Sequence, residues 1–180
     1  MVAFIVIRLI YDVPVNWKVT VIKGNINLNI SKSDIDNLNF SDYFSCYKQL
    51  PEMEKYYWPE NSSIWQMFHE QSPQWVHDLV KEIPQDFEHH VVSTINIPPG
   101  QTIPCHQDKH FILKETYGPG ETWRYLIFLE DWKSGHYFEI YDQPVTGWKS
   151  GDWIKFHQKD WHLAANVGIE PFYSAQITVM

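Results

Sequence analysis

Apolar and polar positions follow two different styles along this chain. Up to about residue 87, strand-like and helix-like patterns are mixed, whereas from residue 88 short strand-like segments follow one another between turn residues. In the first part, the spacing of apolar residues and the helix-start signals predict strands over 2–10 and 17–22 and helices over 31–38, 63–70 and 73–84. Ser31 is the expected cap of the first helix.

The second part has the pattern of an all-β structure. Turn residues such as Gly118-Pro119-Gly120 and Ser150-Gly151 separate its segments, and short strands at this spacing are typical of a β-sandwich or a jelly roll. The strand-like segments are 89–97, 101–108, 122–131, 137–142, 151–156 and 171–180. Because no linker-like stretch divides the two parts, we expect a single domain over 1–180. This domain is mainly β with flanking helices, and residues 1–87 support a β core over 88–180.

Composition and charge narrow the classes of function. Aromatic residues make up 16% of the chain and include nine tryptophans, enough for a substantial core or a ring-lined pocket. A net charge of −8 argues against a sequence-independent nucleic-acid binder, which needs a positive surface. Two cysteines form no disulfide framework, and no signal peptide or membrane-spanning run is evident. We therefore expect a cytoplasmic protein with no nucleic-acid or membrane partner.

The stretch PCHQDKH, residues 104–110, concentrates metal-binding side chains. His106 and Asp108 are two residues apart, so on a strand both would point to the same face. His162, in the later stretch WHLAANVG, is the best candidate for a third ligand. Two imidazoles and one carboxylate leave coordination positions open, which is the arrangement of non-haem Fe(II) oxygenases.

Other residues compete for these roles. His157 is the chief rival of His162, because it is only five residues away. His110 shares the parity of His106 and is either a rival ligand or a partner of a ligand. Cys105 would point to the opposite face of the strand from His106, and we expect it to be a small buried side chain.

Four segments in this order resemble the core of Fe(II)/2-oxoglutarate-dependent dioxygenases. They are IPPGQTIPCHQD, RYLIFLEDWKSGHYFEI, GWKSGDWIKF and WHLAANVGIEPFYSAQITV. The resemblance covers about half the chain, residues 88–180, and is strongest to aspartyl/asparaginyl β-hydroxylase-like and prolyl-hydroxylase-like branches, including small phage-type members. It implies a double-stranded β-helix, a distorted jelly roll, in which His106, Asp108 and His162 hold Fe(II). The Gly151-Asp152 segment matches the approach to the distal histidine, which favours His162 over His157.

One position departs from the family pattern. Many members carry an arginine, followed by x-Ser, that binds the distal carboxylate of 2-oxoglutarate, whereas this chain has Phe172 and keeps only Ser174. A buried carboxylate without a positive partner is costly. Arg124 is the expected substitute, because it shares a strand face with Leu126 and Phe128 and because the β-hydroxylase-like branch has an arginine at the start of this strand. Lys155 is the weaker option.

Three functions compete at this stage. The resemblance implies a dioxygenase that uses 2-oxoglutarate and O2 to hydroxylate a C–H bond, with a prolyl or aspartyl/asparaginyl residue of a protein as the candidate substrate. The alternative is a degenerate, cupin-like jelly-roll module that binds a metal or ligand without oxygenase activity, which would suit Phe172. A metal-dependent hydrolase ranks last, because the chain has no upstream His-x-His pair and no nucleophile motif.

Overall fold

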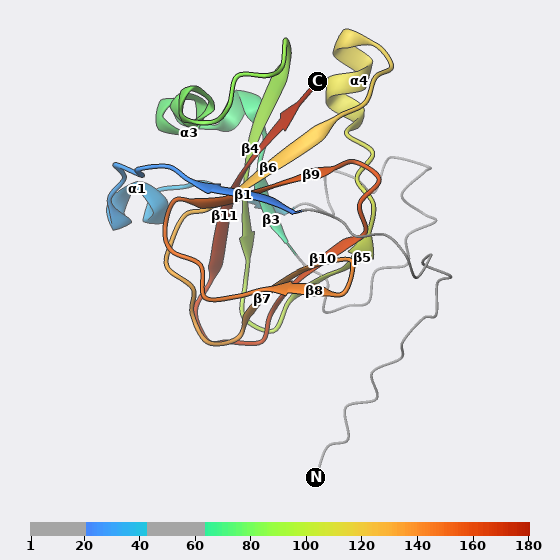
Figure 1. Ribbon diagram of the computed structural model, residues 1–180. Coiled ribbons are helices and arrows are strands. Elements are labelled where there is room, and N and C mark those ends of the chain that lie inside the picture. The colour runs from blue at the N-terminus through green and yellow to red at the C-terminus, as the bar shows by residue number, and fades with distance from the viewer. Residues whose placement is uncertain (1–20, 43–63) are drawn as a thin grey trace.

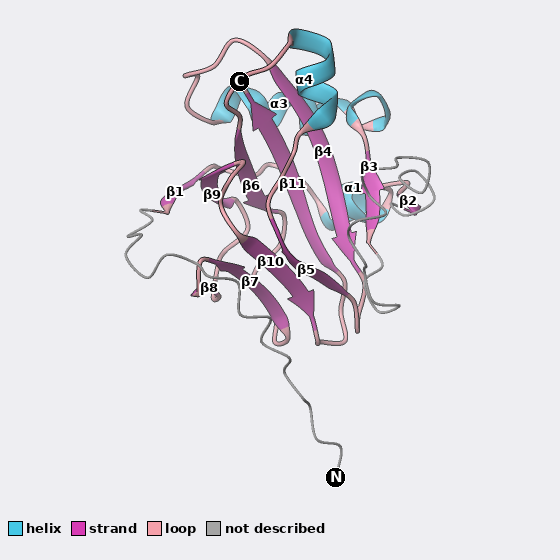
Figure 2. Ribbon diagram, turned by 90° about the vertical axis from the view of Figure 1, so that its right-hand side faces the viewer, coloured by secondary structure: helices cyan, strands magenta, loops and turns pink. Residues whose placement is uncertain are grey.

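The computed structural model describes residues 21–42 and 64–180, and two facing antiparallel β-sheets dominate them (Figure 2). The larger sheet has seven strands in the order β1-β9-β6-β11-β4-β3-β2, and the smaller sheet has four in the order β5-β10-β7-β8. The strands are β1 (Ile22–Asn25), β2 (Ser41–Asp42), β3 (Trp65–Met67), β4 (His90–Ile97), β5 (Thr102–His106), β6 (Trp123–Phe128), β7 (His136–Ile140), β8 (Gln143–Val145), β9 (Asp152–His157), β10 (His162–Asn166) and β11 (Phe172–Val179).

Five short helices accompany the sheets in the described residues. They are α1 (Lys32–Asp36), α3 (Gln74–Asp78), α4 (Phe111–Tyr117) and the 3-10 helices η2 (His69–Gln71) and η3 (Leu79–Glu82). In Figure 1, α1 and α3 lie on one side of the large sheet, and the small sheet lies on the other.

From β4 onward the chain crosses repeatedly between the sheets. β4, β6, β9 and β11 belong to the large sheet, whereas β5, β7, β8 and β10 belong to the small one. This antiparallel alternation is the winding of a jelly roll. The predicted fold class, a mainly β protein with flanking helices built on a double-stranded β-helix, is therefore confirmed.

Strand alternation divides the buried residues into two cores. On β6, Leu126 and Phe128 face the small sheet, whereas Tyr125 and Ile127 face the helices. We call the first set the inner core; its members include Ile95, Ile97, Ile103, Leu126, Phe128, Phe138, Ile140, Ile154, Phe156 and Phe172. The outer core, under α1 and α3, includes Ile35, Val76, Leu79, Tyr125, Ile127, Trp153 and Ile177. Because β6 is buried on both faces, the segment TWRYLIFLED has the nearly continuous apolar run that is typical of a buried strand.

The first part of the chain matches its predicted elements less well. The helix predicted over 31–38 is present as α1, and Ser31 and Asp34 form its capping box. The helix over 73–84 is present as α3 followed by η3. The helix predicted over 63–70 is wrong, because this segment forms β3 and η2, with β3 paired to β4. The strand predicted over 2–10 and most of the one over 17–22 lie outside the described residues.

The pairing of β3 with β4 explains the error over 63–70. Apolar residues there are spaced closely enough to suit a short helix, but the strand gains backbone hydrogen bonds along β4, with Gln66 opposite Ile95 and Met67 opposite Thr94. Sheet pairing of this kind overrides local propensity.

Beyond Met67, a side chain continues the pairing along β4. The Val92 N–H donates to Nδ1 of His69 at 3.0 Å, two residues past the last strand pair, Met67 and Thr94. The His69 ring also packs against His77 and His90, with ring centroids 4.7 and 6.2 Å apart. Burial, followed by the proximity of His77, lowers the pKa of His69. Burial and the two other imidazoles likewise lower the pKa of His90.

This cluster predicts a loss of stability in acid. Because folding lowers the pKa of His69, its contribution is complete above the unfolded value of 6.5 and is lost as the pH falls below it. Protonation also removes the acceptor for the Val92 N–H. Glutamine keeps an acceptor but does not titrate, so His69→Gln should lose less stability than wild type between about pH 7.5 and about pH 5. Urea unfolding at the two pH values measures the difference, and parallel losses in both proteins would contradict this role.

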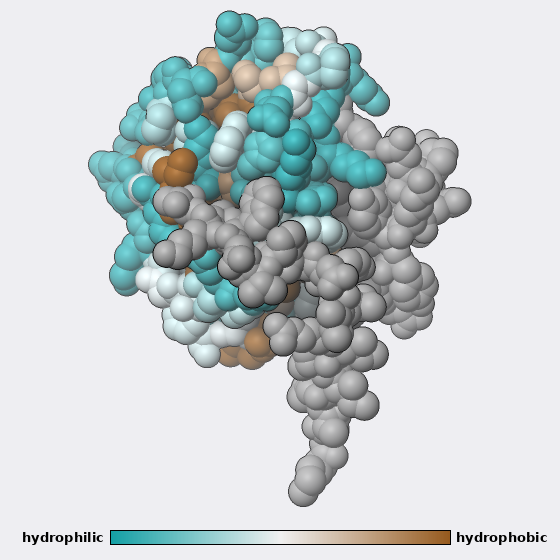
Figure 3. Space-filling view, turned by 45° about the vertical axis from the view of Figure 1, so that its right-hand side comes forward, coloured by the Kyte–Doolittle hydropathy of each residue, from teal (hydrophilic) through white to brown (hydrophobic). Residues whose placement is uncertain are grey.

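The described surface is largely polar on the face drawn in Figure 3, where apolar residues occur in separate small areas. Among the described residues, no helix combines the length and apolar character needed to cross a membrane.

Candidate metal centre

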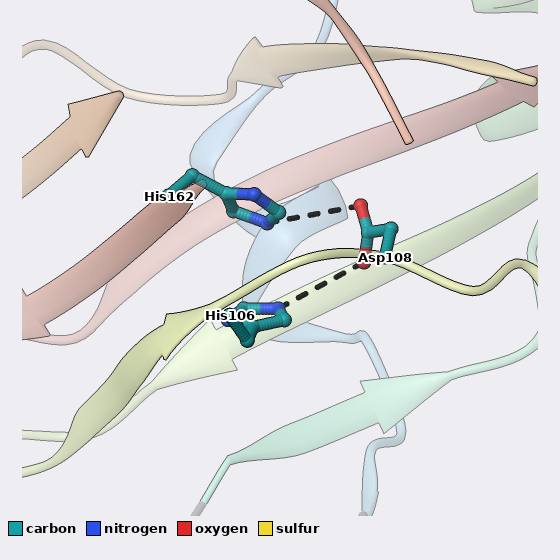
Figure 4. A group of neighbouring side chains, drawn as sticks. All are labelled: His106, Asp108 and His162. Atoms are coloured by element: carbon teal, nitrogen blue, oxygen red, sulfur yellow. Dashed lines mark ion pairs between the residues drawn. The ribbon is translucent and has the colours of Figure 1, made fainter. Parts of the chain in front are cut away.

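The three predicted ligands converge on one point inside the fold (Figure 4). One ligand atom from each of His106, Asp108 and His162 can be chosen so that all lie within 4.8 Å of one another. His106 ends β5 and His162 begins β10, and the two residues are direct partners across these strands. Strand pairing therefore joins two histidines that are far apart in the sequence.

A bulge in β5 orients His106. Ala164 pairs with Ile103 whereas His162 pairs with His106, so one extra residue is inserted on β5 between the two pairs. The bulge breaks the alternation of faces, and both Ile103 of the inner core and His106 of the site can face the interior. Cys105 is exposed, so the prediction that it is a small buried side chain is wrong.

The bulge and the strand end also correct the argument that paired His106 with Asp108. β5 ends at His106, and Asp108 lies in the connection to α4, so shared strand parity does not bring the two side chains together. The connection turns the carboxylate back, and Asp108 Oδ1 lies 3.8 Å from His106 Nε2. The three side chains do lie close together, but a shared strand face is not the cause.

Backbone carbonyls set the tautomers of both histidines. His106 Nδ1 lies 2.7 Å from the Pro104 carbonyl oxygen, and His162 Nδ1 lies 2.9 Å from that of Asp160. A carbonyl accepts only, so each Nδ1 carries the proton and donates it, and each Nε2 presents its lone pair. Both Nε2 atoms are the ones that face Asp108.

Burial and neighbouring charges together keep the three side chains in the protonation states that bind a metal. Burial lowers the pKa of His106, and together with the neighbouring His106 it lowers the pKa of His162 to about 3. Burial alone would raise the pKa of Asp108, but the charge of Arg124, with His110 and His162, holds it well below its usual range. Neutral imidazoles and an ionised carboxylate are the species that coordinate metals.

The residues present fit a metal ion. The buried Asp108 Oδ2 has no hydrogen-bond partner, although an unpaired buried oxygen of this kind is costly. It lies 3.7 Å from His162 Nε2. His106 and His162 both lie close enough to Asp108 for the three residues to hold one ion. A cation would satisfy this carboxylate oxygen, which accepts no hydrogen bond although it is ion-paired with Arg124.

Arg124 reaches the site from the opposite sheet. Its Nη1 lies 3.0 Å from Asp108 Oδ2 and donates to Oδ1 at 3.2 Å, while Nε and Nη2 lie 3.3 Å from Thr178 Oγ1 on β11. It shares the inward face of β6 with Leu126 and Phe128, as predicted. Sequence reasoning missed Thr178, which is aligned with Arg124 only through the pairing of β11 with β6.

Two of the other residues considered for the site, His157 and Lys155, lie elsewhere. His157 packs on Trp123, with its Nε2 3.8 Å from Glu121, and it is not in the ligand set. Lys155 pairs with Asp86 at 2.7 Å outside the inner core, which removes it as a substitute for the family arginine.

Ser174 is buried on β11 opposite Phe128, four residues from Thr178. Among the described contacts, the hydroxyl that bonds Arg124 belongs to Thr178. The assignment of Ser174 to the cosubstrate stays a prediction.

Phe172 occupies a stack of rings at the far end of the inner core. Its ring centroid lies 4.9 Å from that of His136, 5.2 Å from Trp148 and 6.2 Å from Phe128. This packing fills the space around the residue that replaces the family arginine.

Comparisons with known proteins find distant structural similarities. No protein-family model and no curated protein matches this chain. Similar solved structures include the cupin domain of Cnp3 from Schizosaccharomyces pombe, with 10% identity over 65% of this chain and 64% of that one and a TM-score of 0.41. A predicted oxalate decarboxylase from Thermotoga maritima matches with 17% identity over 66% of this chain and 82% of that one, at a TM-score of 0.40. KdgF from Halomonas sp. matches with 9% identity over 64% and 77% of the two chains, at a TM-score of 0.39.

Proposed function

We propose that this protein is an Fe(II)/2-oxoglutarate-dependent dioxygenase that hydroxylates a C–H bond, with a prolyl or aspartyl/asparaginyl residue of a protein as the substrate class. The observation that carries the proposal is the convergence of His106, Asp108 and His162, with Arg124 beside them. Three protein ligands leave coordination positions for a cosubstrate and dioxygen. A nearby guanidinium suits a dicarboxylate cosubstrate.

Each residue has a part in this reaction. Fe(II) held by the two imidazoles and the carboxylate would supply the dioxygen chemistry, in which 2-oxoglutarate and O2 are consumed, succinate and CO2 are released and one oxygen enters the substrate C–H bond. His106 and His162 present their lone pairs because backbone carbonyls hold their Nδ1 protons. The rings of Phe138 and Phe156, centred 6.0 and 4.7 Å from that of His162, hold this histidine in place and exclude water.

Arg124 provides the cosubstrate contact. Its guanidinium contacts Asp108 on one side and donates a hydrogen bond to Thr178 on the other. When a cation takes up the charge of Asp108, the guanidinium can turn to an incoming carboxylate, with Thr178 as its support. Binding of metal and of 2-oxoglutarate should therefore be coupled.

A second candidate function has its own support. The ring stack at Phe172 and the Arg124–Asp108 pair also suit a cupin-like module that binds a metal or a small ligand and performs no oxidation. The two functions differ in whether 2-oxoglutarate joins the metal.

An anaerobic titration separates them. Adding 2-oxoglutarate to the Fe(II)-loaded protein should produce a weak charge-transfer band at roughly 500 nm, a property of the cofactor complex itself. Succinate, which lacks the 2-oxo group, is the matched control and should produce none. Incubation of candidate proteins with the enzyme, Fe(II), ascorbate and 2-oxoglutarate, followed by mass spectrometry, would then identify a peptide that gains one oxygen. Metal binding without the band would favour the non-oxidising module.

A further inference from the structure

A chain of buried polar side chains leads from Asp108 to α4. His110 Nε2 lies 3.1 Å from Asp108 Oδ2, and His110 Nδ1 lies 2.7 Å from Thr122 Oγ1. The Thr122 hydroxyl donates to Gln158 Oε1 at 2.8 Å, and Lys114 Nζ donates to the same oxygen. Thr122 is fully buried and Gln158 nearly so. Buried chains of this kind specify one arrangement of protons.

The direction of the hydrogen bonds follows from the chemistry of the groups. Lys114 can only donate, so the atom of Gln158 that it contacts is the amide oxygen. Thr122 has one hydroxyl proton, and that proton goes to the same oxygen. The Thr122 oxygen must therefore accept from His110, which places the proton of a neutral His110 ring on Nδ1.

This tautomer turns two acceptors toward each other. The lone pair of His110 Nε2 then faces Asp108 Oδ2, and neither atom takes part in a hydrogen bond, although Arg124 Nη1 is ion-paired with this oxygen at 3.0 Å. The opposite tautomer would let Nε2–H donate to Asp108 and satisfy it without a metal. His110 also has a left-handed backbone, with φ of 49°, which holds its ring between Asp108 and Thr122.

We infer that Thr122 is a positioning residue for the metal centre: by fixing the tautomer of His110, it withholds the hydrogen bond that His110 could donate to Asp108 Oδ2 and keeps this oxygen available to a cation. The inference rests on the metal-binding part of the proposed function and requires neither 2-oxoglutarate nor turnover. It also explains why this buried carboxylate oxygen accepts no hydrogen bond, although it is ion-paired with Arg124.

Two variants should change the tautomer by different routes. Thr122→Val removes the acceptor for Nδ1–H, and Gln158→Met removes the acceptor of the Thr122 proton, so that Thr122 can donate to His110 Nδ1. In both, His110 should place its proton on Nε2 and donate to Asp108. Mn(II) affinity should then fall by about 10- to 100-fold, the usual size of the effect when the surroundings of a metal ligand are changed by mutation. Thr122→Ser keeps the hydroxyl and should bind Mn(II) like wild type.

Two readouts test this inference. Nitrogen NMR of isotopically labelled, metal-free protein at mildly alkaline pH, where imidazole is neutral, reports the tautomer of His110. Electron paramagnetic resonance of free Mn(II) measures the affinity. Thr116→Val on α4 is the matched control, because the Thr116 hydroxyl bonds the Ile112 carbonyl and no member of the chain.

The possible outcomes separate this inference from the proposed function. An Nε2–H tautomer in wild type, or unchanged Mn(II) affinity in both Thr122→Val and Gln158→Met, would overturn the positioning role. A loss of affinity in Thr122→Val that Thr122→Ser shares would also count against it, because the hydroxyl would then not be the cause. Wild type that binds Mn(II) but gives no band with 2-oxoglutarate would leave this inference standing and remove the dioxygenase.

Discussion

Asp108→Ala should lower the affinity for Mn(II) or Fe(II) by more than about 100-fold, because even partners of metal ligands typically contribute 10- to 100-fold. The variant removes the only carboxylate of the ligand set. It also leaves the Arg124 guanidinium beside the two histidines without its anionic partner, so a positive charge would repel the incoming cation. Calorimetric titration with Mn(II) measures the change.

Asp78→Ala is the matched control for this experiment. Asp78 is a carboxylate in a surface ion pair with Lys81, at 2.6 Å, and lies outside the ligand set. Its removal should leave Mn(II) affinity unchanged. Binding by Asp108→Ala within a few-fold of wild type, or retained decarboxylation of 2-oxoglutarate, would place the metal elsewhere.

Arg124→Ala should weaken binding of 2-oxoglutarate to the Mn(II)-loaded protein by at least about 100-fold. Removing one side of a buried charge pair commonly costs about 3–5 kcal/mol, and each 1.4 kcal/mol is tenfold in affinity. Binding of Mn(II) itself should not weaken, because Arg124 competes with the cation for Asp108. Titration of 2-oxoglutarate into the metal-loaded proteins gives both affinities.

Lys155→Met provides the comparison for Arg124. Lys155 also lies on the large sheet, but it pairs with Asp86 and packs over the rings of Trp123 and Tyr125. This variant should bind 2-oxoglutarate as wild type does. Equal affinities in Arg124→Ala and wild type would remove Arg124 from the site, and loss of binding in both variants would indicate a general disturbance of the fold.

The strands of the second part could be predicted because sequence and packing agree there. β6 has buried residues on both faces, so its run of apolar residues is unambiguous. The segment over 63–70 could not be assigned in this way. It forms a strand because it pairs with β4, and residues 63–70 alone do not reveal this pairing. α4 was missed as well; its residues follow a left-handed His110 rather than a conventional cap.

The candidate site likewise has a part that could be predicted from the sequence and a part that could not. His106, Asp108 and His162 could be proposed from residue type and order, since few side chains bind a metal. Their partners could not, because Thr178, Thr122 and Gln158 are ordinary polar residues that reach the site only through the pairing and ends of distant strands. The bulge in β5 could not be foreseen either, so the argument from strand faces does not explain why these side chains lie close together.

The bulge has a practical consequence for detecting the metal. It leaves Cys105 exposed, directly next to a ligand whose side chain contributes to the buried site. Burial of part of the side chain raises the pKa of the Cys105 thiol, so labelling is best done in mildly alkaline solution. A fluorinated tag attached there, in a Cys46→Ser background, would be one peptide bond away from His106 without obstructing the interior. Its resonance could then report the arrival of a metal ion in real time, including ions that have no colour or unpaired electrons.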